Sequence, residues 1–458
     1  MVRVKALGDS SLPKLLVSKV DTWRLVLFAS GDFAFNLYWQ SVMLFLLFYY
    51  TEALGLPVGW AAATYMAALA WDGLVSLAVG VLADRHREQG YRRYLSLGAV
   101  PLGLCFVFAY LPPIGSGSWA PAIVFVTHLL FRTAYAAVNV PYLAMTARVS
   151  SHAGDRALVA GLRMLFGTAA MVTVSLGTVS LGRWLTGGTG ASAYFAAAAV
   201  FGVAGSLILL LVAWLVPERE EPAAQAPVSL RAALTAVGAN RAFVTLNAAM
   251  AAITVASIFL SKSVLYYYKY QLDNEQAGQV ALAAMGLTGA AAVPVWTVIC
   301  RKLGGRVTWF MAAAPAMLLL GLFAVVAVRE IGTMRLFLVA MQLLLTGVHI
   351  VFWAMLPNTV EWGERATGAR LEGAVFGLAA LLQRTAIGAA TGLFGLTLGV
   401  IGFEANLQQS AQALEGLRLA IAYVPLAFVA LSIILMMASP LRRQAYDDIV
   451  MELAKRRR

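Results

Sequence analysis

The chain has 458 residues, of which 61% are hydrophobic and only 12% are charged. This composition leaves too little polar surface for a water-soluble protein of this length, and it excludes a separate soluble domain. The formal net charge of +12 comes from Lys and Arg in short connections and in the tail that ends Lys455 to Arg458. It therefore indicates membrane topology and attraction to anionic lipid rather than nucleic-acid binding.

Twelve apolar stretches follow one another along the chain, and each is long enough to cross a bilayer as a helix. In order they cover residues 23–50, 57–83, 94–112, 119–147, 158–182, 191–216, 242–266, 277–300, 307–328, 336–360, 371–402 and 417–438. Lys and Arg gather on the connections that share a side with both termini, which predicts that both termini are cytoplasmic. The pattern predicts an all-α membrane protein with twelve transmembrane helices.

The chain divides once, where a polar stretch rich in Pro, Ala and Gln follows the sixth span. We expect a cytoplasmic tail over 1–22, a six-helix bundle over 23–216, a linker over 217–241, a second six-helix bundle over 242–438 and a basic cytoplasmic tail over 439–458. The halves resemble a duplication, because a basic turn containing Arg92 or Arg306 follows the second helix of each. Transporters built from parallel repeats bind substrate between the halves, near the midplane.

Polar residues inside the spans carry most of the functional information, because a charge at the centre of a helix costs about 2.5 to 3.5 kcal/mol on the insertion scale. Span one has Asp32, Asn36 and Gln40 on one face, and span two has Asp72 near its middle. Span four carries a continuous polar stripe of His128, Arg132, Tyr135, Asn139, Tyr142 and Thr146. Such a stripe cannot face lipid. Later spans add Arg163, Trp353, Glu361 and Arg384.

Each of these residues also has a purely structural interpretation. Asp72, Arg163 and Arg384 either form a buried ion-pair latch or handle substrate and protons. Arg132 and His128 either face the interior or lie in an outer water layer. Tyr266, Tyr267 and Tyr268 fit an aromatic belt at the membrane surface better than a ligand cage. Asp84 and Arg85, together with Glu361, are expected to act as gate charges on the cytoplasmic side.

Several ordered segments resemble the glycoside-pentoside-hexuronide:cation symporters, the melibiose permease family of the major facilitator superfamily. They are Gly31 to Asn36, Trp71-Asp72-Gly73, Asn139 to Tyr142, and Ala354 to Glu364 with its continuation to Gly373. These segments cover both halves in the right order. The resemblance implies a major facilitator fold of two six-helix bundles, and secondary transport of a sugar across a bacterial cytoplasmic membrane without a cofactor.

The resemblance also assigns roles in substrate binding. Arg163 matches a helix-five arginine that holds sugar hydroxyls, and Tyr135 matches an aromatic residue near the sugar. Asn36 and Asn139 stand where the melibiose permease has sugar-binding aspartates, and Asp32 lies one turn from Asn36. Since two acidic ligands are missing, an anionic sugar acid or a glycoside suits Arg163 and Arg132 better than a cationic substrate does.

For coupling, Asp72 matches the first of two cation-binding carboxylates, and Arg384 falls on a lysine associated with the cation site. The second carboxylate is absent, because Val75 and Ser76 stand in its place. One carboxylate beside a positive arginine supplies few of the hard oxygen ligands that a sodium ion needs. Proton coupling, or passage without coupling, is therefore favoured over sodium symport.

Two other classes of function compete with sugar transport, and only the first of them remains an alternative. A lysolipid transporter of the same fold is one, although Tyr135, Tyr142 and Trp353 favour a sugar because sugars stack on aromatic rings. An intramembrane enzyme is the other, and no His-Glu-x-x-His or Gly-x-Ser-x-Gly motif supports it. The four histidines lack metal-ligand spacing, and Cys105 and Cys300 give no basis for a disulfide. We expect a monomer without a metal or cofactor.

Overall fold

A computed structural model describes residues 21–85, 90–112, 120–149, 153–218, 235, 237–326, 328–367, 372–441 and 452. Within them the chain is helical, with no strand. The long helices are α1 (Thr22–Ser41), α2 (Val58–Arg85), α3 (Arg92–Phe108), α4 (Ala120–Val149), α5 (Ala153–Thr186), α6 (Ala191–Leu215), α8 (Arg241–Tyr266), α9 (Glu275–Leu303), α10 (Gly305–Val325), α11 (Ile331–Thr367), α12 (Glu372–Val400) and α13 (Ala411–Met437). Each corresponds to one of the predicted spans.

Nine of these helices are long and apolar enough to cross a membrane within the described residues. The other three are α1, α3 and α12. Helix α3 has only 17 residues, and α1 and α12 carry polar residues that include Asp32 and Arg384. These helices are kept in the bundle by packing against their neighbours, α1 on α5, α3 on α6 and α12 on α2.

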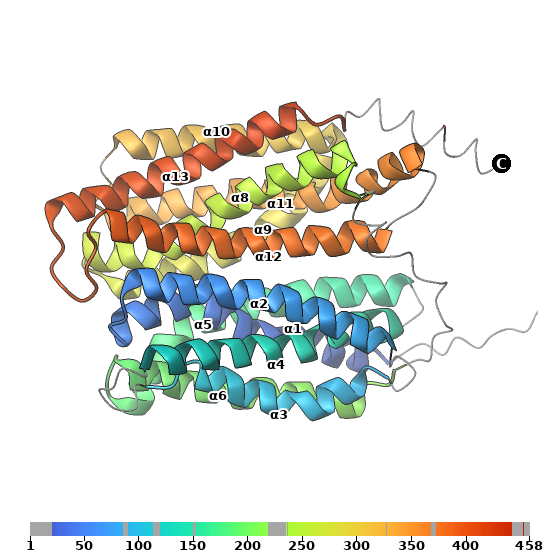
Figure 1. Cartoon of the computed structure of the whole chain (residues 1–458), viewed down its shortest axis with the longest axis horizontal. Coiled ribbons are helices and arrows are strands. Elements are labelled where there is room, and N and C mark those ends of the chain that lie inside the picture. The colour runs from blue at the N-terminus through green and yellow to red at the C-terminus, as the bar shows by residue number, and fades with distance from the viewer. Residues whose placement is uncertain are drawn as a thin grey trace, which may run out of the picture.

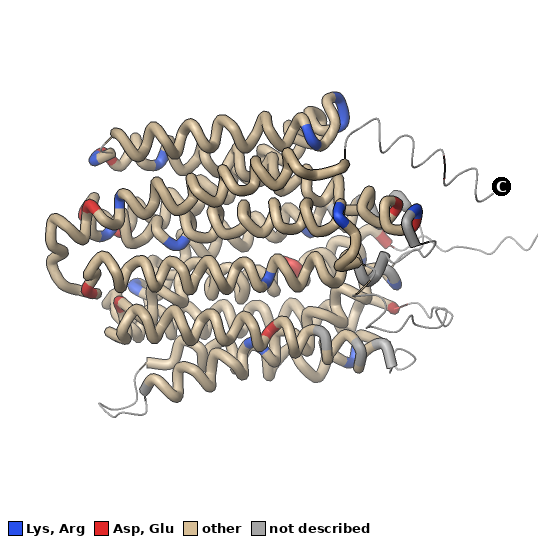
Figure 2. Tube along the Cα trace, turned by 45° about the horizontal axis from the view of Figure 1, so that its top comes forward, with Lys and Arg blue, Asp and Glu red and all other residues tan. Residues whose placement is uncertain are grey.

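The helices form two groups that lie side by side (Figure 1), α1–α6 in one half and α8–α13 in the other. We call them the N-half and the C-half. They meet mainly where α2 packs against α12 and α5 packs against α9. Charged residues gather toward the two ends of the molecule, and few lie along its middle (Figure 2). This distribution is expected of a protein whose middle faces lipid.

The first helix of each half ends in a short π-helix, η2 (Tyr49–Ala53) or η4 (Tyr267–Gln271). The Leu54 N–H donates to the Tyr49 carbonyl at 3.0 Å, and the Leu272 N–H donates to the Tyr267 carbonyl at 3.2 Å. Both π-helices are thus closed by the same backbone hydrogen bond. A further π-helical turn, η1 (Val42–Leu46), interrupts the first helix. Such turns are rare and often lie at functional sites.

The tyrosines of these π-helices correct one expectation. Tyr266, Tyr267 and Tyr268 are fully buried, so the interfacial belt predicted for them is wrong. The Tyr267 hydroxyl donates to the Val328 carbonyl at 2.5 Å, and the Tyr49 hydroxyl donates to the Tyr110 carbonyl at 2.9 Å. In each half, a tyrosine therefore fastens the end of the first helix to the end of the third.

The opposite end of the molecule repeats itself in the same way. At the start of α3, Arg92 donates to the carbonyls of Ala213 and Trp214 at the end of α6, at 2.5 and 3.1 Å. At the start of α10, Arg306 donates to the carbonyls of Ser439 and Met437 at the end of α13, at 2.6 and 2.8 Å. The third and sixth helices of both halves are thus joined by equivalent arginines, as the proposed duplication requires.

The two halves approach closely at one end. We call it the loop end, because the segments after α1, α8 and α12 lie there, and we call the opposite end the terminal end. Across the α2/α12 contact, a Cβ placed on Gly388 would lie 3.4 Å from the Cβ of Leu69, and one on Gly395 would lie 2.1 Å from the Cβ of Ala62. Small residues here let the two helix backbones come together.

Toward the terminal end this contact is lost. Gly377 lies on the same face of α12 as Gly395, about five turns away at 3.6 residues per turn. A Cβ on Gly377 would meet no described atom within 4 Å, and the axes of α2 and α12 diverge toward that end in Figure 1. The halves are closed against each other at the loop end and separate toward the terminal end.

Candidate substrate and coupling site

Asp32 and Arg163 form an ion pair between α1 and α5. Nε of Arg163 donates to Oδ2 of Asp32, and Nη2 donates to Oδ1 at 3.2 Å. The third donor, Nη1, reaches the Thr146 hydroxyl at 3.2 Å. The side chains of Arg163 and Asp32 are 22% and 16% exposed, so solvent can reach the pair. Two of the predicted substrate ligands thus bind each other in this conformation.

Tyr142 of α4 also binds the carboxylate of Asp32. Its hydroxyl donates to Oδ2 of Asp32 at 2.8 Å, and its ring stacks on Phe28 with centroids 4.8 Å apart. Gly31 makes this approach possible, because a Cβ there would lie 2.7 Å from the Tyr142 ring. A glycine before Asp32 therefore lets the Tyr142 side chain reach the Asp32 carboxylate.

The remaining predicted substrate ligands in the N-half lie on α1 and α4. The Asn36 amide donates to the carbonyl of Asp32 at 2.8 Å and accepts from the Gln40 amide at 3.4 Å. On α4, Tyr135 packs edge-on against Phe35 at 5.7 Å, and Asn139 is buried one turn further along. Asn36 therefore lies one turn from Asp32 on α1, and Tyr135 contacts the same helix from α4.

Asp72 and Arg384 form a second ion pair, which joins α2 of the N-half to α12 of the C-half. Nη1 of Arg384 donates to Oδ2 of Asp72 at 3.0 Å and also to the Ser76 hydroxyl. The other carboxylate oxygen, Oδ1, is buried with no hydrogen-bond partner among the described residues.

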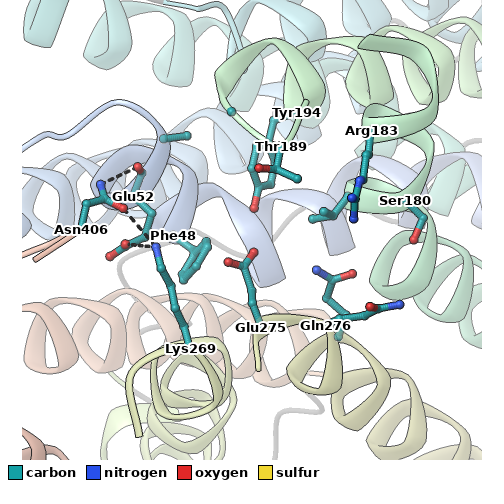
Figure 3. Close-up of a pocket in the computed structure, with 14 residues that line it drawn as sticks. Phe48, Glu52, Ser180, Arg183, Thr189, Tyr194, Lys269, Glu275, Gln276 and Asn406 are labelled. Carbon is teal, nitrogen blue, oxygen red and sulfur yellow. Dashed lines mark hydrogen bonds and ion pairs between the residues drawn. The ribbon is translucent and has the colours of Figure 1, made fainter. Parts of the chain in front are cut away.

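A third ion pair closes the loop end. Glu52 accepts from Nζ of Lys269 at 2.5 Å and from the Tyr270 hydroxyl, and its backbone carbonyl accepts from the Asn406 amide at 2.7 Å. These contacts join the N-half to the C-half beside a cavity of about 390 Å³. Figure 3 shows Glu275 and Gln276 of α9 across this cavity from Thr189 and Tyr194. None of the predicted site residues lines it.

Sequence reasoning missed Lys262, which lies on α8 at the interface between the halves. Its Nζ donates to the Met43 carbonyl and lies 4.3 Å from the centroid of the Tyr65 ring. Arg132 and His128 are near this position and are fully buried, so the outer water layer considered for them is wrong. Lys262 was missed because it follows a long apolar run and lies close to the expected end of its span.

The remaining predicted residues lie at the end of α2 and on α11. Asp84 and Arg85 end α2, but their side chains lie outside the described residues, and Glu361 is partly buried on α11. Trp353, on the same helix, is 50% exposed and packs edge-on against Phe352 at 5.1 Å. Among the described residues, no group of three His, Cys, Asp or Glu could hold a metal.

Comparison with known proteins matches residues 27–443 to the family described as MFS/sugar transport protein. The chain belongs to this family. It is 25% identical to the glucuronide carrier protein homolog of Escherichia coli, over 95% of this chain and 96% of the relative. It is 24% identical to the isoprimeverose transporter of Lactiplantibacillus pentosus, over 89% and 86%.

Among solved structures, a bacterial homolog of the lysosomal transporter Spinster, described as inward-facing and unoccupied, has a TM-score of 0.69 with 12% identity. The alignment covers 94% of this chain and 99% of that one. The predicted family resemblance and the major facilitator fold are confirmed. As a member of the MFS/sugar transport protein family, the chain is a multi-pass membrane transporter and not an enzyme.

Proposed function

We propose that this transporter moves a sugar acid, or a glycoside of a sugar acid, by alternating access. We also propose that a proton gradient drives the transport. The observation that carries the proposal is the partly exposed Asp32–Arg163 pair. A guanidinium binds carboxylates in a two-point geometry, so a substrate carboxylate can take over the donors that Asp32 now occupies. The relative named as a glucuronide carrier homolog supports an acidic sugar, and the isoprimeverose transporter supports a glycoside.

The polar residues around this pair suit the rest of a sugar. Asn36 offers amide groups for hydroxyls, and the ring of Tyr135 offers an apolar face for the sugar ring to stack on. We also assign Asn139 of α4 and Trp353 of α11 to binding of the same substrate. Asp32 keeps Arg163 paired while the site is empty, because an unpaired guanidinium within the bundle is costly.

Coupling is assigned to Asp72 and Arg384. Protonation of Asp72 would remove the charge that holds Arg384, and this weakens a contact between the two halves. Sodium would have to compete with the guanidinium for one carboxylate and one hydroxyl, which are few ligands for such a cation. A proton needs only the one buried oxygen, Oδ1, that lacks a partner.

The proposed orientation places both termini in the cytoplasm of a bacterial cell, in agreement with the basic connections. The loop end then faces outward, and the described conformation is inward-facing. The gate residues Asp84, Arg85 and Glu361 lie toward the open side in this orientation. We assign residues 217–241 to a cytoplasmic linker and expect the transporter to act as a monomer.

Uptake by proteoliposomes tests the proposal. The panel contains labelled glucuronate, 4-nitrophenyl β-D-glucuronide, 4-nitrophenyl β-D-glucoside and lysophosphatidylglycerol, each with an imposed proton or sodium gradient. We expect uptake of the acidic sugars, accelerated by an inward proton gradient alone. Uptake of the lysolipid and of no sugar would replace the proposal with lipid transport.

A further inference from the structure

Three basic side chains that the proposed function does not use lie together between the halves: Arg132 and His128 on α4 and Lys262 on α8. Their exposed fractions are 0%, 0% and 5%. They surround the ring of Tyr65, whose centroid lies 5.7 Å from the Arg132 guanidinium carbon, 4.3 Å from the Lys262 Nζ and 5.3 Å from the centroid of the His128 ring. We call these three residues the basic cluster.

The basic cluster has donors without acceptors. Arg132 donates from Nε to Nε2 of His128 at 3.3 Å, but its Nη1 and Nη2 are buried with no hydrogen-bond partner of good geometry among the described residues. Because Nε2 of His128 accepts this bond, the neutral ring carries its proton on Nδ1, which is also buried without a partner. Three buried donor atoms of the basic cluster therefore lack an acceptor of good geometry among the described residues.

No described carboxylate forms an ion pair with any member of the cluster, whereas Asp32, Asp72 and Glu52 each have a basic partner. Aromatic faces offset part of the cost, since the Arg132 guanidinium lies 5.2 Å from the Trp39 ring centroid. A buried arginine without an anion is nevertheless unfavourable. An ionisable residue retained in such a place within a membrane is a candidate for function.

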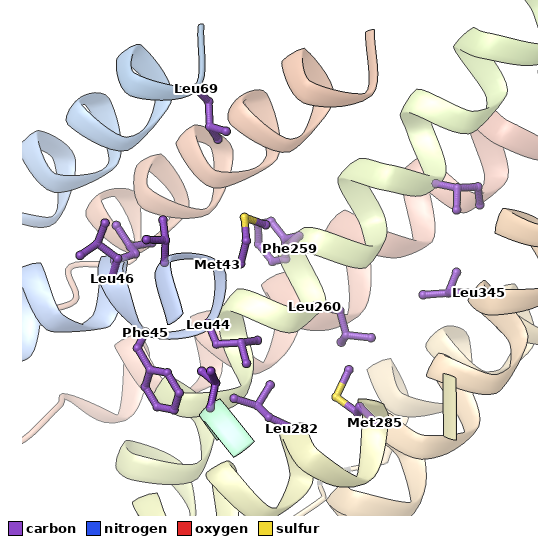
Figure 4. Close-up of a cluster of buried hydrophobic side chains, with 14 of the residues drawn as sticks. Met43, Leu44, Phe45, Leu46, Leu69, Phe259, Leu260, Leu282, Met285 and Leu345 are labelled. Atoms are coloured by element: carbon purple, nitrogen blue, oxygen red, sulfur yellow. The ribbon is translucent and has the colours of Figure 1, made fainter. Parts of the chain in front are cut away.

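The position of the cluster indicates when an anion could reach it. Lys262 donates to the carbonyl of Met43 in η1, across the contact between the halves. Figure 4 shows Met43 beside Phe259 of α8, within a cluster of buried apolar side chains that come from both halves. Separation of the halves at the loop end must break the Lys262 bond, and it would uncover Arg132 and His128 to the opened path.

We propose that the basic cluster binds the acidic group of the substrate when the loop end is open. The carboxylate accepts from the two terminal nitrogens of Arg132, whose Nε is held by His128, and it exchanges these donors for Arg163 when the terminal end opens. The inference rests on the proposed function and deepens it, because it assigns to the acidic group a contribution to affinity that a neutral glycoside lacks. A site built from buried donors disfavours a ligand that leaves them unpaired.

The test compares two glycosides that differ only in the acidic group, 4-nitrophenyl β-D-glucuronide and 4-nitrophenyl β-D-glucoside. Initial rates of uptake into proteoliposomes give KM for each. In Arg132→Met we expect KM for the glucuronide to rise about tenfold or more, in line with the loss of charge-assisted hydrogen bonds, and KM for the glucoside to stay within about twofold. The control is Arg335→Gln, which removes an exposed arginine at the start of α11 and should change neither value.

Thermal unfolding separates a binding role from a structural one. Because Arg132 has no anion in this conformation, Arg132→Met should unfold at or above the temperature of the wild type, and Arg132→Lys should keep that stability while losing the two-point geometry. A lower unfolding temperature in both variants, or an equal rise in KM for both glycosides, would assign the cluster to structure.

If the wild type carries both glycosides and Arg132→Met leaves both KM values unchanged, the subsite is wrong and the proposed function stands. If the wild type carries neither, the proposed function itself fails.

Discussion

Asp72 of α2 and Arg384 of α12 bind each other across the two halves, with Nη1 of the arginine 3.0 Å from Oδ2 of the aspartate. The carboxylate is fully buried and the arginine is 23% exposed. Together with Glu52–Lys269, this is one of two ion pairs that cross between the halves in the described chain. A change in charge at Asp72 therefore acts directly on a contact that must break when the transporter changes conformation.

Asp72→Asn should abolish accumulation against a gradient and keep exchange of substrate between the two sides. Exchange needs reorientation of the protein but no net movement of protons. Counterflow and proton-driven uptake, measured in proteoliposomes, separate the two activities. The matched control is Asp273→Asn at the loop end, where the backbone φ of 49° is one that asparagine adopts readily. Normal uphill accumulation by Asp72→Asn, or tighter substrate binding in sodium, would refute this assignment.

Arg163→Ala should abolish substrate binding while the protein still inserts and folds. Asp32 keeps the Tyr142 hydroxyl as a donor at 2.8 Å and is partly exposed, so its charge remains solvated. Binding of 4-nitrophenyl β-D-glucuronide, followed by calorimetry, should weaken by about a hundredfold, as expected for a two-point charged interaction. Arg24→Ala, which removes a more exposed arginine of α1, should bind normally. Unchanged affinity in Arg163→Ala would make that arginine structural.

Lys269→Gln should weaken closure at the loop end. Glu52 is almost completely buried by its contacts with Lys269, Tyr270 and Asn406, and a hydrogen bond to a charged group contributes about 1.5 to 3 kcal/mol. The population open at the loop end should rise about tenfold or more. Spin labels on the exposed positions Thr186 and Arg329 report this as a longer distance by electron paramagnetic resonance.

The matched control for this change is Glu404→Gln, which neutralises an exposed side chain in the neighbouring loop. Its distance distribution should match that of the protein without the substitution. An unchanged distribution in Lys269→Gln would mean that the ion pair does not set the conformational equilibrium.

Much of the fold could be predicted, because lipid leaves a spanning chain few options other than helices. The predicted spans differ from the helices mainly at their ends. Helix α5 begins at Ala153 rather than at 158, and α11 continues to Thr367 rather than ending at 360. Helices continue past the apolar core into water, and apolar length cannot show this.

The site was harder to predict, because helical spacing shows which residues share a face but not which helices are neighbours. Asp32 and Arg163 were both expected to bind substrate, yet nothing in the sequence indicated that they bind each other. Lys262 was missed, and the aromatic belt predicted for Tyr266 to Tyr268 was wrong, for a related reason. These residues lie near the end of a span, where a basic or aromatic residue normally meets the membrane surface. Here the opposing half covers Lys262 and Tyr266, and the connection from α10 to the start of α11 covers Tyr267 and Tyr268.

Glu218 should be important for stability rather than for transport. It forms an ion pair with Arg148 at 2.8 Å, with both side chains nearly buried, and it accepts from the N–H groups of Tyr91 and Arg92 at 2.7 and 3.0 Å. An acidic group at the start of a helix is favourable there. Glu218→Ala should lower the free energy of unfolding by about 3 to 5 kcal/mol, because it breaks a nearly buried ion pair and removes the acceptor of two backbone N–H groups.

Thermal unfolding in detergent measures this loss, with the exposed Glu330→Ala as the control. The surviving folded protein should bind the glucuronide with normal affinity. Normal stability in Glu218→Ala would show that the start of α3 does not depend on this carboxylate.

The central claim is that the halves close at the loop end and must separate there during transport, and a disulfide between Leu69→Cys and Gly388→Cys tests it most directly. The relevant Cβ positions are 3.4 Å apart, close to the distance of about 3.8 Å in native disulfides. Cys105 and Cys300 are first replaced by alanine. The control is Gly98→Cys with Val138→Cys, whose Cβ positions lie 3.7 Å apart within the N-half. We predict that both disulfides form on oxidation, that only the Leu69/Gly388 bond stops uptake, and that a reductant restores it. Full uptake with that disulfide completely formed would contradict the account.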